Sequence, residues 1–436
     1  MDLKPRSQRL AACLLPAMLG LAIASPSHAA DSPYLFGDWN GTRTHLADQG
    51  ITFDAGYTSE IAHNFTGGTH SLTRYTDQWR AGSTLDLEKL WGWKGGTFQI
   101  MVSDRNGRNL SADANLGTNQ QVQEVYGRGQ TVHLTVFALD QTFLDGKLDW
   151  RIGRLHVGGD FASFSCDFQN LTFCGSQPGN IVGDYWVNWP TSQWGTRLKL
   201  QASDQIYVQI GAYQVNPKYV EDRWARKNGW KLNNPGGTTG AMIPVEFGWT
   251  PKNGDLEGSY KIGAWYSNAG GQDLYYDINH QPIALTGGEA LQRNSRYGAY
   301  INMQQQLDSG SDGQGTTVFF NLTQADRNTS ATDRQMAMGL EYSGPFKRMN
   351  DMVGFALGAT HPSSRAAKSQ RLYNQLHPNA PLQVLNGYEY STELFYNWSP
   401  TPSINLRPNL QYVLHPGGAR DNKNAFVFGL KTDVAF

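Results

Sequence analysis

Arginine, aspartate and tryptophan residues are concentrated in one stretch of the chain and in the segments that flank it. The stretch Gly158–Trp194 contains Asp160, Asp167, Asp184, Trp186 and Trp189, and the basic residues near it are Arg105, Arg128, Arg151, Arg154 and Arg197. Guanidinium groups donate several hydrogen bonds, carboxylates accept them, and indole rings offer flat apolar faces. These side chains can therefore pair with one another as solvated charges and packing rings, or they can bind a polar solute together.

Other residue groupings predict no catalytic or metal site. The ten His residues show no metal-ligand spacing, and neither HExxH nor Gly-x-Ser-x-Gly occurs. Of the three cysteines, Cys13 lies in an N-terminal apolar run, which leaves Cys166 and Cys174 as an even pair. In an exported chain such a pair is expected to form a disulfide. We predict no catalytic residue, no metal ligand and no cofactor.

The N-terminus has the pattern of a secretory signal peptide over residues 1–29. Basic residues precede the apolar run Leu10–Ile23, and Ser27-His28-Ala29 offers a small-x-small cleavage site. Without this segment the net charge is about −3, which is too balanced to suggest a nucleic-acid partner. No later apolar run has the length of a membrane helix, so a membrane-embedded chain would have to form a closed barrel.

Alternation of apolar and polar residues dominates the rest of the chain. Apolar residues make up only 39% of the sequence while aromatic residues reach 12%, which favours a large sheet with one apolar face over a thick core. Alternation at this spacing is typical of half-buried strands. We predict sixteen strands, over Ile51–Phe65, Thr76–Leu90, Gly96–Arg105, Thr131–Leu144, Lys147–Val157, Gly195–Ser203, Ile206–Asn216, Met242–Thr250, Gly258–Asn268, Tyr297–Leu307, Gly315–Asp326, Arg334–Gly344, Asp351–His361, Gly387–Ser399, Ile404–His415 and Ala425–Phe436.

The connections between these segments are alternately short and long. Asp145-Gly146 and Asp204-Gln205 are short, whereas 106–130, 158–194 and 217–241 are long. Short turns on one rim and long loops on the other are typical of outer-membrane barrels. A β-sandwich has no such bias, and a propeller would repeat at roughly forty residues. We therefore predict an all-β fold, a 16-stranded antiparallel transmembrane β-barrel over residues 51–436 with short periplasmic turns and long extracellular loops.

The two ends of the mature chain carry further signals. The alternation in FVFGLKTDVAF continues to Phe436, although chain ends usually fray. A closed barrel must pair its last strand with its first, because open edges are costly in lipid. Residues 30–50 are expected to form a periplasmic segment with a short helix, which Asn40 or Thr42 would cap and Gly50 would end.

Sixteen strands enclose an aqueous channel, whereas eight are filled by side chains. A pore is therefore the first functional hypothesis. A barrel enzyme such as an outer-membrane lipase or protease is a second, and it would need a nucleophile and a base brought together in space. A secreted sugar-binding β-protein is a third.

Several long motifs resemble the carbohydrate-selective porins of the OprB type over nearly the whole mature chain. They are LFGDWNGTRTHLADQGI, TDQWRAGSTLDLEKLWGW, QEVYGRGQT, FLDGKLDWRIGRLHVGGDFASFSCDFQNLTFCGSQPGN, NWPTSQWG and RPNLQYVLHPGG. The resemblance implies a passive channel for glucose and related mono- and disaccharides in a Gram-negative outer membrane. One departure is Gly159, where relatives can carry a second acid beside Asp160.

The resemblance also implies roles for particular residues and partners. Gly158–Trp194 becomes the candidate constriction, lined by the Arg, Asp and Trp residues named above, because a sugar needs polar groups to replace water and an aromatic platform. Expected partners are sugars, outer-membrane lipid and lipopolysaccharide, and the barrel-assembly machinery through Phe436, with a homo-oligomer as a further option. A general diffusion pore remains the alternative. The preferred sugar and the oligomeric state stay open.

Overall fold

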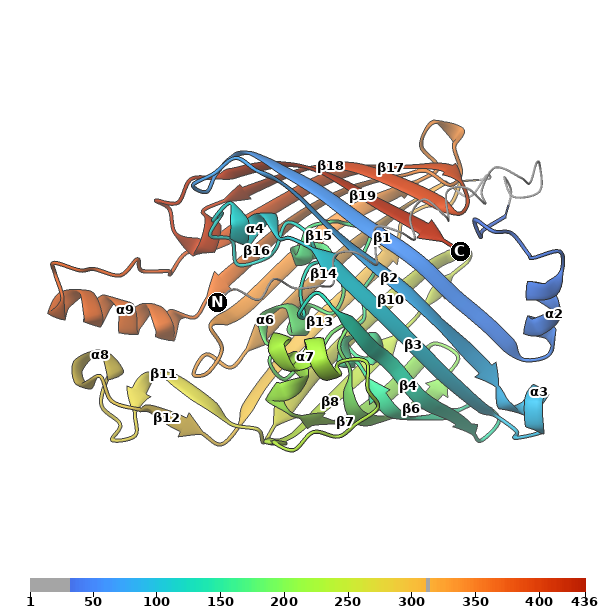
Figure 1. The fold of residues 1–436 in the computed structure, drawn as a ribbon, viewed down its shortest axis with the longest axis horizontal. Coiled ribbons are helices and arrows are strands. Elements are labelled where there is room, and N and C mark those ends of the chain that lie inside the picture. The colour runs from blue at the N-terminus through green and yellow to red at the C-terminus, as the bar shows by residue number, and fades with distance from the viewer. Residues whose placement is uncertain (1–31, 311–313) are drawn as a thin grey trace, which may run out of the picture.

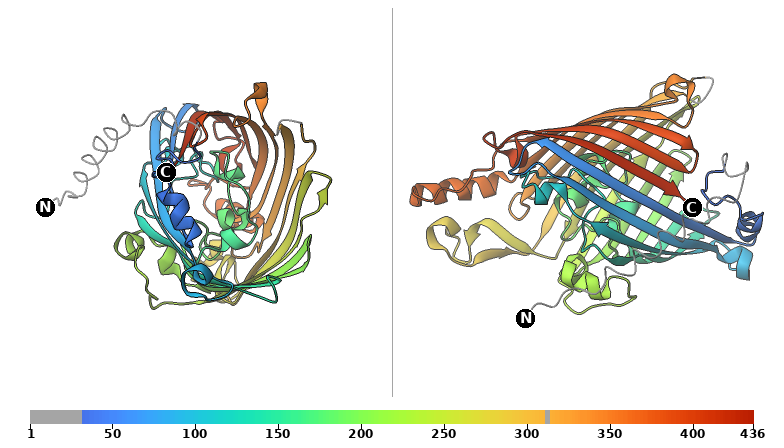
Figure 2. Two further views of the ribbon diagram at one scale, coloured as in Figure 1. Left: turned by 90° about the vertical axis from the view of Figure 1, so that its right-hand side faces the viewer. Right: turned by 45° about the horizontal axis from the view of Figure 1, so that its top comes forward.

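The strands of the computed structural model form a closed barrel (Figures 1 and 2). The structure describes residues 32–310 and 314–436. Within these residues the main sheet has seventeen strands, of which the two-residue β9 (Lys252–Asn253) pairs only with β10. The other sixteen pair antiparallel with the barrel strands before and after them, and β1 pairs with β19 to close the barrel. The predicted strand number is confirmed.

Each barrel strand overlaps one predicted segment. The strands are β1 (Ile51–Thr66), β2 (Thr73–Asp86), β3 (Gly96–Gly107), β4 (Val132–Phe143), β5 (Leu148–Leu155), β6 (Gln193–Ser203), β7 (Ile206–Val215), β8 (Gly240–Trp249), β10 (Leu256–Ser267), β13 (Arg296–Gln306), β14 (Gly315–Ala325), β15 (Thr332–Ser343), β16 (Met352–Pro362), β17 (Glu389–Thr401), β18 (Ile404–Leu414) and β19 (Ala425–Ala435).

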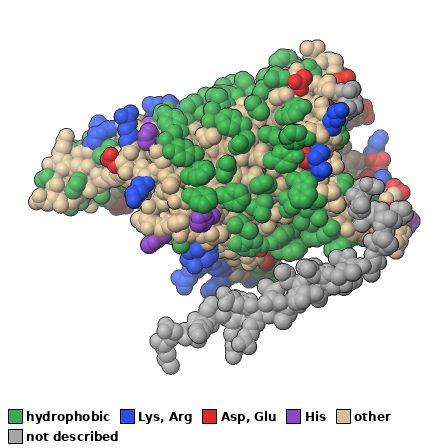
Figure 3. Space-filling model, turned by 90° about the horizontal axis from the view of Figure 1, so that it is seen from above, with side chains coloured by type: hydrophobic (Ala, Val, Ile, Leu, Met, Phe, Trp, Pro, Cys, Tyr) green, Lys and Arg blue, Asp and Glu red, His purple; other side chains and the backbone are tan. Residues whose placement is uncertain are grey.

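Side chains alternate between the lumen and the outer wall, as the sequence pattern predicted. On β17, Glu389 and Glu393 face the lumen and are at most 1% exposed, whereas Tyr390 and Leu394 on the outer wall are each 45% exposed. Figure 3 shows apolar side chains spread over the outer wall between the two rims. This is the surface that a hydrocarbon environment requires.

Glycines on the lumen side leave room for aromatic rings of the neighbouring strand. A Cβ added to Gly248 would lie 2.1 Å from the Tyr207 ring, and one added to Gly263 would lie 2.2 Å from the Tyr300 ring. The two tyrosine hydroxyls donate to the carboxylate of Glu246 at 2.8 and 2.7 Å. The small residue and the ring thus fill one layer of the wall together.

Short turns and long loops lie at opposite rims. The turns contain α3 (Leu87–Trp91) and the 3-10 turn η4 (Pro345–Lys347), and the long loops contain α4 (Leu110–Asp113), α5 (Val157–Asp160), η2 (Leu171–Phe173), α6 (Gln177–Ile181), η3 (Pro217–Val220), α7 (Asp222–Asn228), β11 (Gly271–Asp277), α8 (Ile283–Thr286), β12 (Ala290–Arg293), α9 (Ser364–Leu376) and η5 (Pro416–Gly418). Figure 1 shows α9 and the β11–β12 hairpin projecting from the long-loop rim. Among the helices described, none is long and apolar enough to cross a membrane.

The predicted short helix is present before the first strand as α2 (Thr42–Asp48), at the short-turn rim (Figure 1). Its expected cap is different, because Gly41 occupies the N-cap position in a left-handed conformation and makes no side-chain bond. Asp38 instead accepts hydrogen bonds from the amide and the hydroxyl of Thr44, both at 2.9 Å. Gly50 follows the helix with a φ of 98°. The predicted signal peptide lies outside the described residues.

Candidate functional site: the constricted lumen

Two of the long loops fold inward and fill much of the lumen (Figure 2). One is residues 108–131, between β3 and β4, and the other is residues 156–192, between β5 and β6. The two loops are bonded to each other, since the Leu171 amide donates to the Gln121 carbonyl at 2.9 Å and the Glu124 amide donates to the Gln169 carbonyl at 3.0 Å. The sequence indicated an inward role only for the second loop, so the contribution of the first was missed.

Lumen-facing glutamates on β17 anchor both inward loops through the main chain. The carboxylate of Glu389 accepts from the amides of Asn119 at 2.6 Å and Gln120 at 3.3 Å. The carboxylate of Glu393 accepts from the amides of Gln169 and Asn170, both at 2.8 Å. Carboxylates that accept backbone amide hydrogen bonds make strong, directional contacts. One strand of the wall therefore fixes the positions of both loops.

Lys431 on β19, a strand of the closing seam, anchors the same loops. Its Nζ donates to the Glu124 carboxylate at 3.0 Å, to the Cys166 carbonyl at 2.8 Å and to the Phe168 carbonyl at 3.1 Å. Cys166 and Cys174 are joined in a disulfide, which closes a short ring within the second loop. A buried ammonium group needs such partners, because an unpaired charge is costly to bury.

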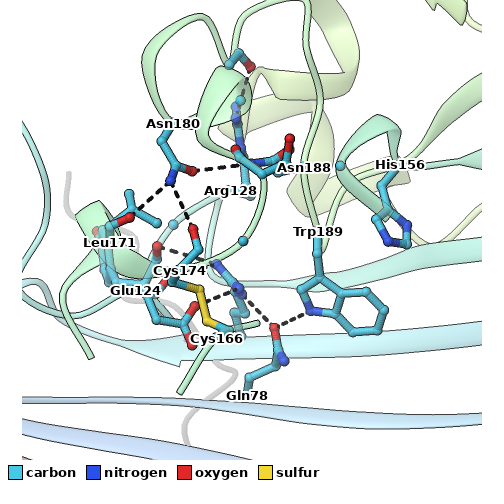
Figure 4. A pocket seen from close by; sticks show the side chains of 18 of the residues that line it. Gln78, Glu124, Arg128, His156, Cys166, Leu171, Cys174, Asn180, Asn188 and Trp189 are labelled. Carbon is cyan, nitrogen blue, oxygen red and sulfur yellow. Dashed lines mark hydrogen bonds and ion pairs between the residues drawn. A yellow bond between two sulfur atoms is a disulfide. The ribbon is translucent and has the colours of Figure 1, made fainter. Parts of the chain in front are cut away.

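The inward loops leave a cavity of about 800 Å³ against the wall formed by β1, β2, β3 and β19. Its lining is mixed, with cations, carboxylates, amides and one tryptophan. Its lining includes Gln78, Arg80, Arg105, Asn119, Glu124, Arg128, His156, Cys166, Cys174, Asn180, Asn188, Trp189, Lys431 and Asp433. Figure 4 shows several of them converging on one space. Mixed polar groups around an aromatic face suit a neutral, hydroxyl-rich solute.

Trp189 is the tryptophan of this cavity, which Tyr126, Phe164 and His156 also line. Its indole Nε1 donates to Gln78 Oε1 at 2.7 Å, and its ring meets the His156 ring edge-on at 5.5 Å (Figure 4). Burial lowers the pKa of His156 to about 4, so the imidazole is neutral near pH 7. The hydrogen bond to Gln78 and the ring contact with His156 hold the indole in one orientation. Of the two predicted tryptophans, Trp189 is the one that faces the cavity.

Two of the predicted arginines line the same cavity. Arg105 Nε donates to Gln78 Oε1 at 2.8 Å, and its Nη2 lies 3.9 Å from the Glu124 carboxylate. Arg128 Nη2 donates to the Gly183 carbonyl at 2.9 Å, which joins the first loop to the second. Arg105 Nη1 also donates to the carbonyls of Glu124 and Tyr126, at 3.4 and 3.5 Å. Arg105, Arg128 and Trp189 thus line the same cavity.

A second predicted group lies against another part of the wall and is internally paired. Asp160 accepts from Arg151 Nη1 at 3.2 Å and from the Tyr213 hydroxyl at 3.0 Å. Arg197 donates to Asp149 at 2.8 Å and lies 3.8 Å from Asp160. The ion pairs with Arg151 and Arg197 attach the start of the second loop to β5 and β6, and the hydrogen bond from Tyr213 attaches it to β7. Arg151, Asp160 and Arg197 do not line the 800 Å³ cavity.

The remaining two aspartates are also paired with wall arginines. Asp184 accepts a hydrogen bond from Arg296 on β13, and Asp167 lies 3.5 Å from Arg407 on β18. Neither aspartate is among the residues that line the cavity. Both fit the interpretation that the sequence left open, in which a lumen charge pairs with a charge of opposite sign.

Trp186 and Arg154 lie elsewhere than expected. Trp186 is 0% exposed and packs edge-on against Trp265 and Tyr300, at 5.2 and 5.9 Å. It is part of the packed interior of the loop and offers no face to a solute. Arg154 is 2% exposed and lies 4.5 Å from the Tyr219 ring, under the loop that contains α7. Arg154 therefore packs between the wall and that loop.

The sequence reasoning missed several residues of the site. Glu124 lies in the first inward loop, and the wall residues Gln78, Glu389, Glu393 and Lys431 contact the inward loops. A signal was available for three of them, because Glu389, Glu393 and Lys431 are charged residues on the lumen side of their strands. The alternation placed them correctly but gave no reason to connect them with loops far away in sequence.

Comparisons with known proteins agree with this arrangement. Residues 70–436 match the model of the OprB family, described as carbohydrate-selective porins. Porin B of Pseudomonas aeruginosa is 42% identical, with 98% of each chain covered, and the putative porin QuiX of Acinetobacter baylyi is 34% identical, with 96% of this chain and 97% of that one covered. The high-pH structure of Pseudomonas putida OprB superimposes with a TM-score of 0.90 at 40% identity, covering 94% of this chain and 100% of that chain.

Proposed function

The chain belongs to the OprB family of carbohydrate-selective porins of the Gram-negative outer membrane, and from that premise we propose that glucose and related mono- and disaccharides pass through the cavity beside Trp189. Family membership indicates a channel rather than an enzyme. The solute would move down its concentration gradient. Selectivity would come from weak binding at the constriction rather than from size alone.

The polar lining of the cavity beside Trp189 carries this proposal. Asn119, His156 and Asn188 line it together with the cations and carboxylates named above. Amide and imidazole groups can donate and accept hydrogen bonds. A sugar hydroxyl both donates and accepts, so a row of hydroxyl groups can satisfy amide donors and acceptors alike.

Trp189 and the arginines would complete the recognition. The apolar C–H face of a pyranose ring can stack on the indole, while the N–H donors of Arg105 and Arg128 bind its oxygens. The cavity holds carboxylates as well as cations, which favours a neutral solute over an anion. We expect a millimolar dissociation constant, about −4 kcal/mol, so that the solute also leaves.

Ion current through single channels in planar bilayers tests the proposal. Glucose should reduce the current of the unmodified channel in a saturable way. Trp189→Ala should raise the half-blocking glucose concentration about tenfold, since the stacking face is lost, whereas Trp189→Phe should keep much of the block. Trp91→Ala is the matched control, because Trp91 is 72% exposed in a turn and far from the cavity.

The alternative is a general diffusion pore. It would give a glucose flux that rises linearly with concentration in proteoliposomes, with no difference between Trp189→Ala and Trp91→Ala. That result would reject sugar selectivity at this site while leaving the barrel and its channel intact.

A further inference from the structure

The loop between β7 and β8, residues 216–239, does not enter the lumen. Figure 2 shows its helix α7 outside the outline of the barrel, and Figure 1 places it toward the long-loop rim. The Gly229 carbonyl accepts from the Leu134 amide at 2.9 Å, and the Asn233 carbonyl accepts from Trp194 Nε1 at 3.0 Å. The loop is therefore held against the outer side of the wall.

Hydrogen bonds and ring packing hold the backbone of this loop in place, so its exposed side chains start from fixed positions. Arg154 Nη1 donates to the Asn233 carbonyl at 3.3 Å, and Tyr219 packs edge-on against Trp224 at 5.7 Å. Arg226 Nε donates to the Gly129 carbonyl at 2.9 Å, and its other end lies 3.9 Å from Asp222. A preorganised surface loses little conformational entropy when it binds a partner.

The exposed face of the loop is strongly basic. Residues 216–239 contain five basic and two acidic residues. Arg226 is bonded to the Gly129 carbonyl and lies near Asp222. The four other cations are Lys218, Arg223, Lys227 and Lys231. All four are exposed, and none of them forms an ion pair with a carboxylate of the described residues. Arg223 and Lys227 are four positions apart on α7 and lie on the same helix face.

Two large apolar side chains accompany these cations. Trp230 is 57% exposed and Leu232 is 48% exposed. On the side of the molecule where Figures 1 and 2 place α7, Figure 3 shows Lys and Arg side chains gathered at the lower edge of the view, next to the apolar wall. Exposed tryptophan beside cations, at the boundary of an apolar belt, is typical of a membrane–water interface.

We propose that Lys218, Arg223, Lys227 and Lys231 form a binding surface for the phosphate groups of outer-leaflet lipids, with Trp230 and Leu232 inserted beside the acyl chains. The surface lies just above the apolar belt of the barrel. A lipid whose phosphate binds there can lay its acyl chains against that belt, and this favours a lipid headgroup as the occupant. Each cation near an anionic lipid surface contributes favourably to binding. Arg154 and Tyr219 hold the platform that presents the surface.

Titration of the purified, folded barrel in neutral detergent with diphosphorylated lipid A, followed by native mass spectrometry, tests this proposal. The test variant replaces Lys218, Arg223, Lys227 and Lys231 with Gln. The control replaces Lys347, Arg371, Arg420 and Lys423, which are exposed in other loops or turns, and so removes the same charge. Heat-modifiable migration in gels confirms that both barrels are folded.

We expect the test variant to bind lipid A at least tenfold more weakly than the unmodified barrel, and the control to differ less than twofold. Dephosphorylated lipid A and free inorganic phosphate should not bind measurably to the unmodified barrel or to either variant. Equal weakening in both variants would overturn the proposal, as would equal binding of free phosphate. Dimers of the unmodified barrel that the test variant loses would also overturn it, because the surface would then be a contact between copies of the chain.

Discussion

Arg43 donates a hydrogen bond to the main-chain oxygen of Phe436, the last residue of the chain, at 2.9 Å. The same guanidinium donates to the Phe53 carbonyl on β1 at 3.0 Å. The ring of Phe36 stacks on the ring of Phe436 at a centroid distance of 5.4 Å. One side chain from the segment before the barrel thus binds both strands of the closing seam, which gives this segment a structural role beyond that of a tether.

Replacing Arg43 by Ala should weaken the seam. Arg43 is 7% exposed, so its loss leaves two carbonyl groups without their charged donor, and hydrogen bonds to charged groups contribute about 1.5–3 kcal/mol. We expect the temperature at which the barrel unfolds in detergent to fall, as measured by heat-modifiable migration. Arg43→Lys should recover only part of the lost unfolding temperature, because a single ammonium group cannot replace the planar guanidinium that donates to two carbonyls at once. An unchanged unfolding temperature, equal to that of Lys94→Ala, would contradict this role.

Deleting Phe436 should impair assembly more than the loss of one exposed aromatic ring. The Phe436 ring stacks on Trp79 at 5.6 Å as well as on Phe36. Phe428→Ala is the matched control, because Phe428 is on β19, the strand that Phe436 follows, and is 39% exposed. We expect several-fold less folded barrel in outer membranes after the deletion, as quantified by immunoblotting of unheated samples. Equal amounts from the deletion and the control would reject a special role for the terminus.

Replacing Glu393 by Ala should release the second inward loop. The change removes the acceptor of two buried amides, at a cost of about 1–3 kcal/mol for each. We expect noisier single-channel currents and faster proteolytic cleavage within 156–192. Glu393→Gln keeps one carbonyl acceptor and should show an intermediate effect. Cleavage at the unmodified rate in Glu393→Ala would show that the disulfide and Lys431 hold the loop without this strand.

The contact between two extracellular loops should resist acid down to low pH. Burial alone would raise the pKa of Asp273, but hydrogen bonds from Arg365, from the amides of Tyr276 and Tyr275, and from Arg293 lower it overall. Because the folded pKa is depressed, its stabilisation is complete above the ordinary carboxyl range near pH 4 and is lost as pH falls below it.

Hydrogen exchange in 271–293 and 364–376 measures this dependence. Protection should be constant from pH 7 to about pH 4 and should decrease toward pH 2. Asp273→Asn should already lose protection at pH 7, because it removes the charge that both arginines bind. Protection in Asp273→Asn that matches the unmodified barrel at pH 7 would rule out this lock between the loops.

Strand positions could be predicted from the sequence because their pattern is local. A strand in a barrel has one side toward lipid, so its residues alternate whatever the rest of the chain does. The same rule applies to Arg154. Ile152 is 39% exposed on the outer wall, and Arg154 has the same parity, opposite to that of Arg151. Alternation thus predicted that Arg154 faces away from the lumen.

The interior of the loops could not be predicted in this way. Trp186 and Trp189 are three residues apart in a stretch with no period, and nothing local distinguishes a packed indole from one that faces a cavity. Their difference depends on Trp265 and Gln78, which come from strands distant in sequence. The pairing of Glu389 and Glu393 with the loops is likewise a long-range contact that one sequence does not record.

Those two glutamates hold the loops by main-chain amides, and this has an evolutionary consequence. Every residue except proline carries the same amide, so the attachment of the loop is indifferent to most changes of its side chains. Loop residues that contact the solute can therefore be substituted while the backbone of the loop keeps its position against the wall. A barrel built in this way can change its solute preference through substitutions in its two inward loops, while the strands that anchor those loops keep their positions.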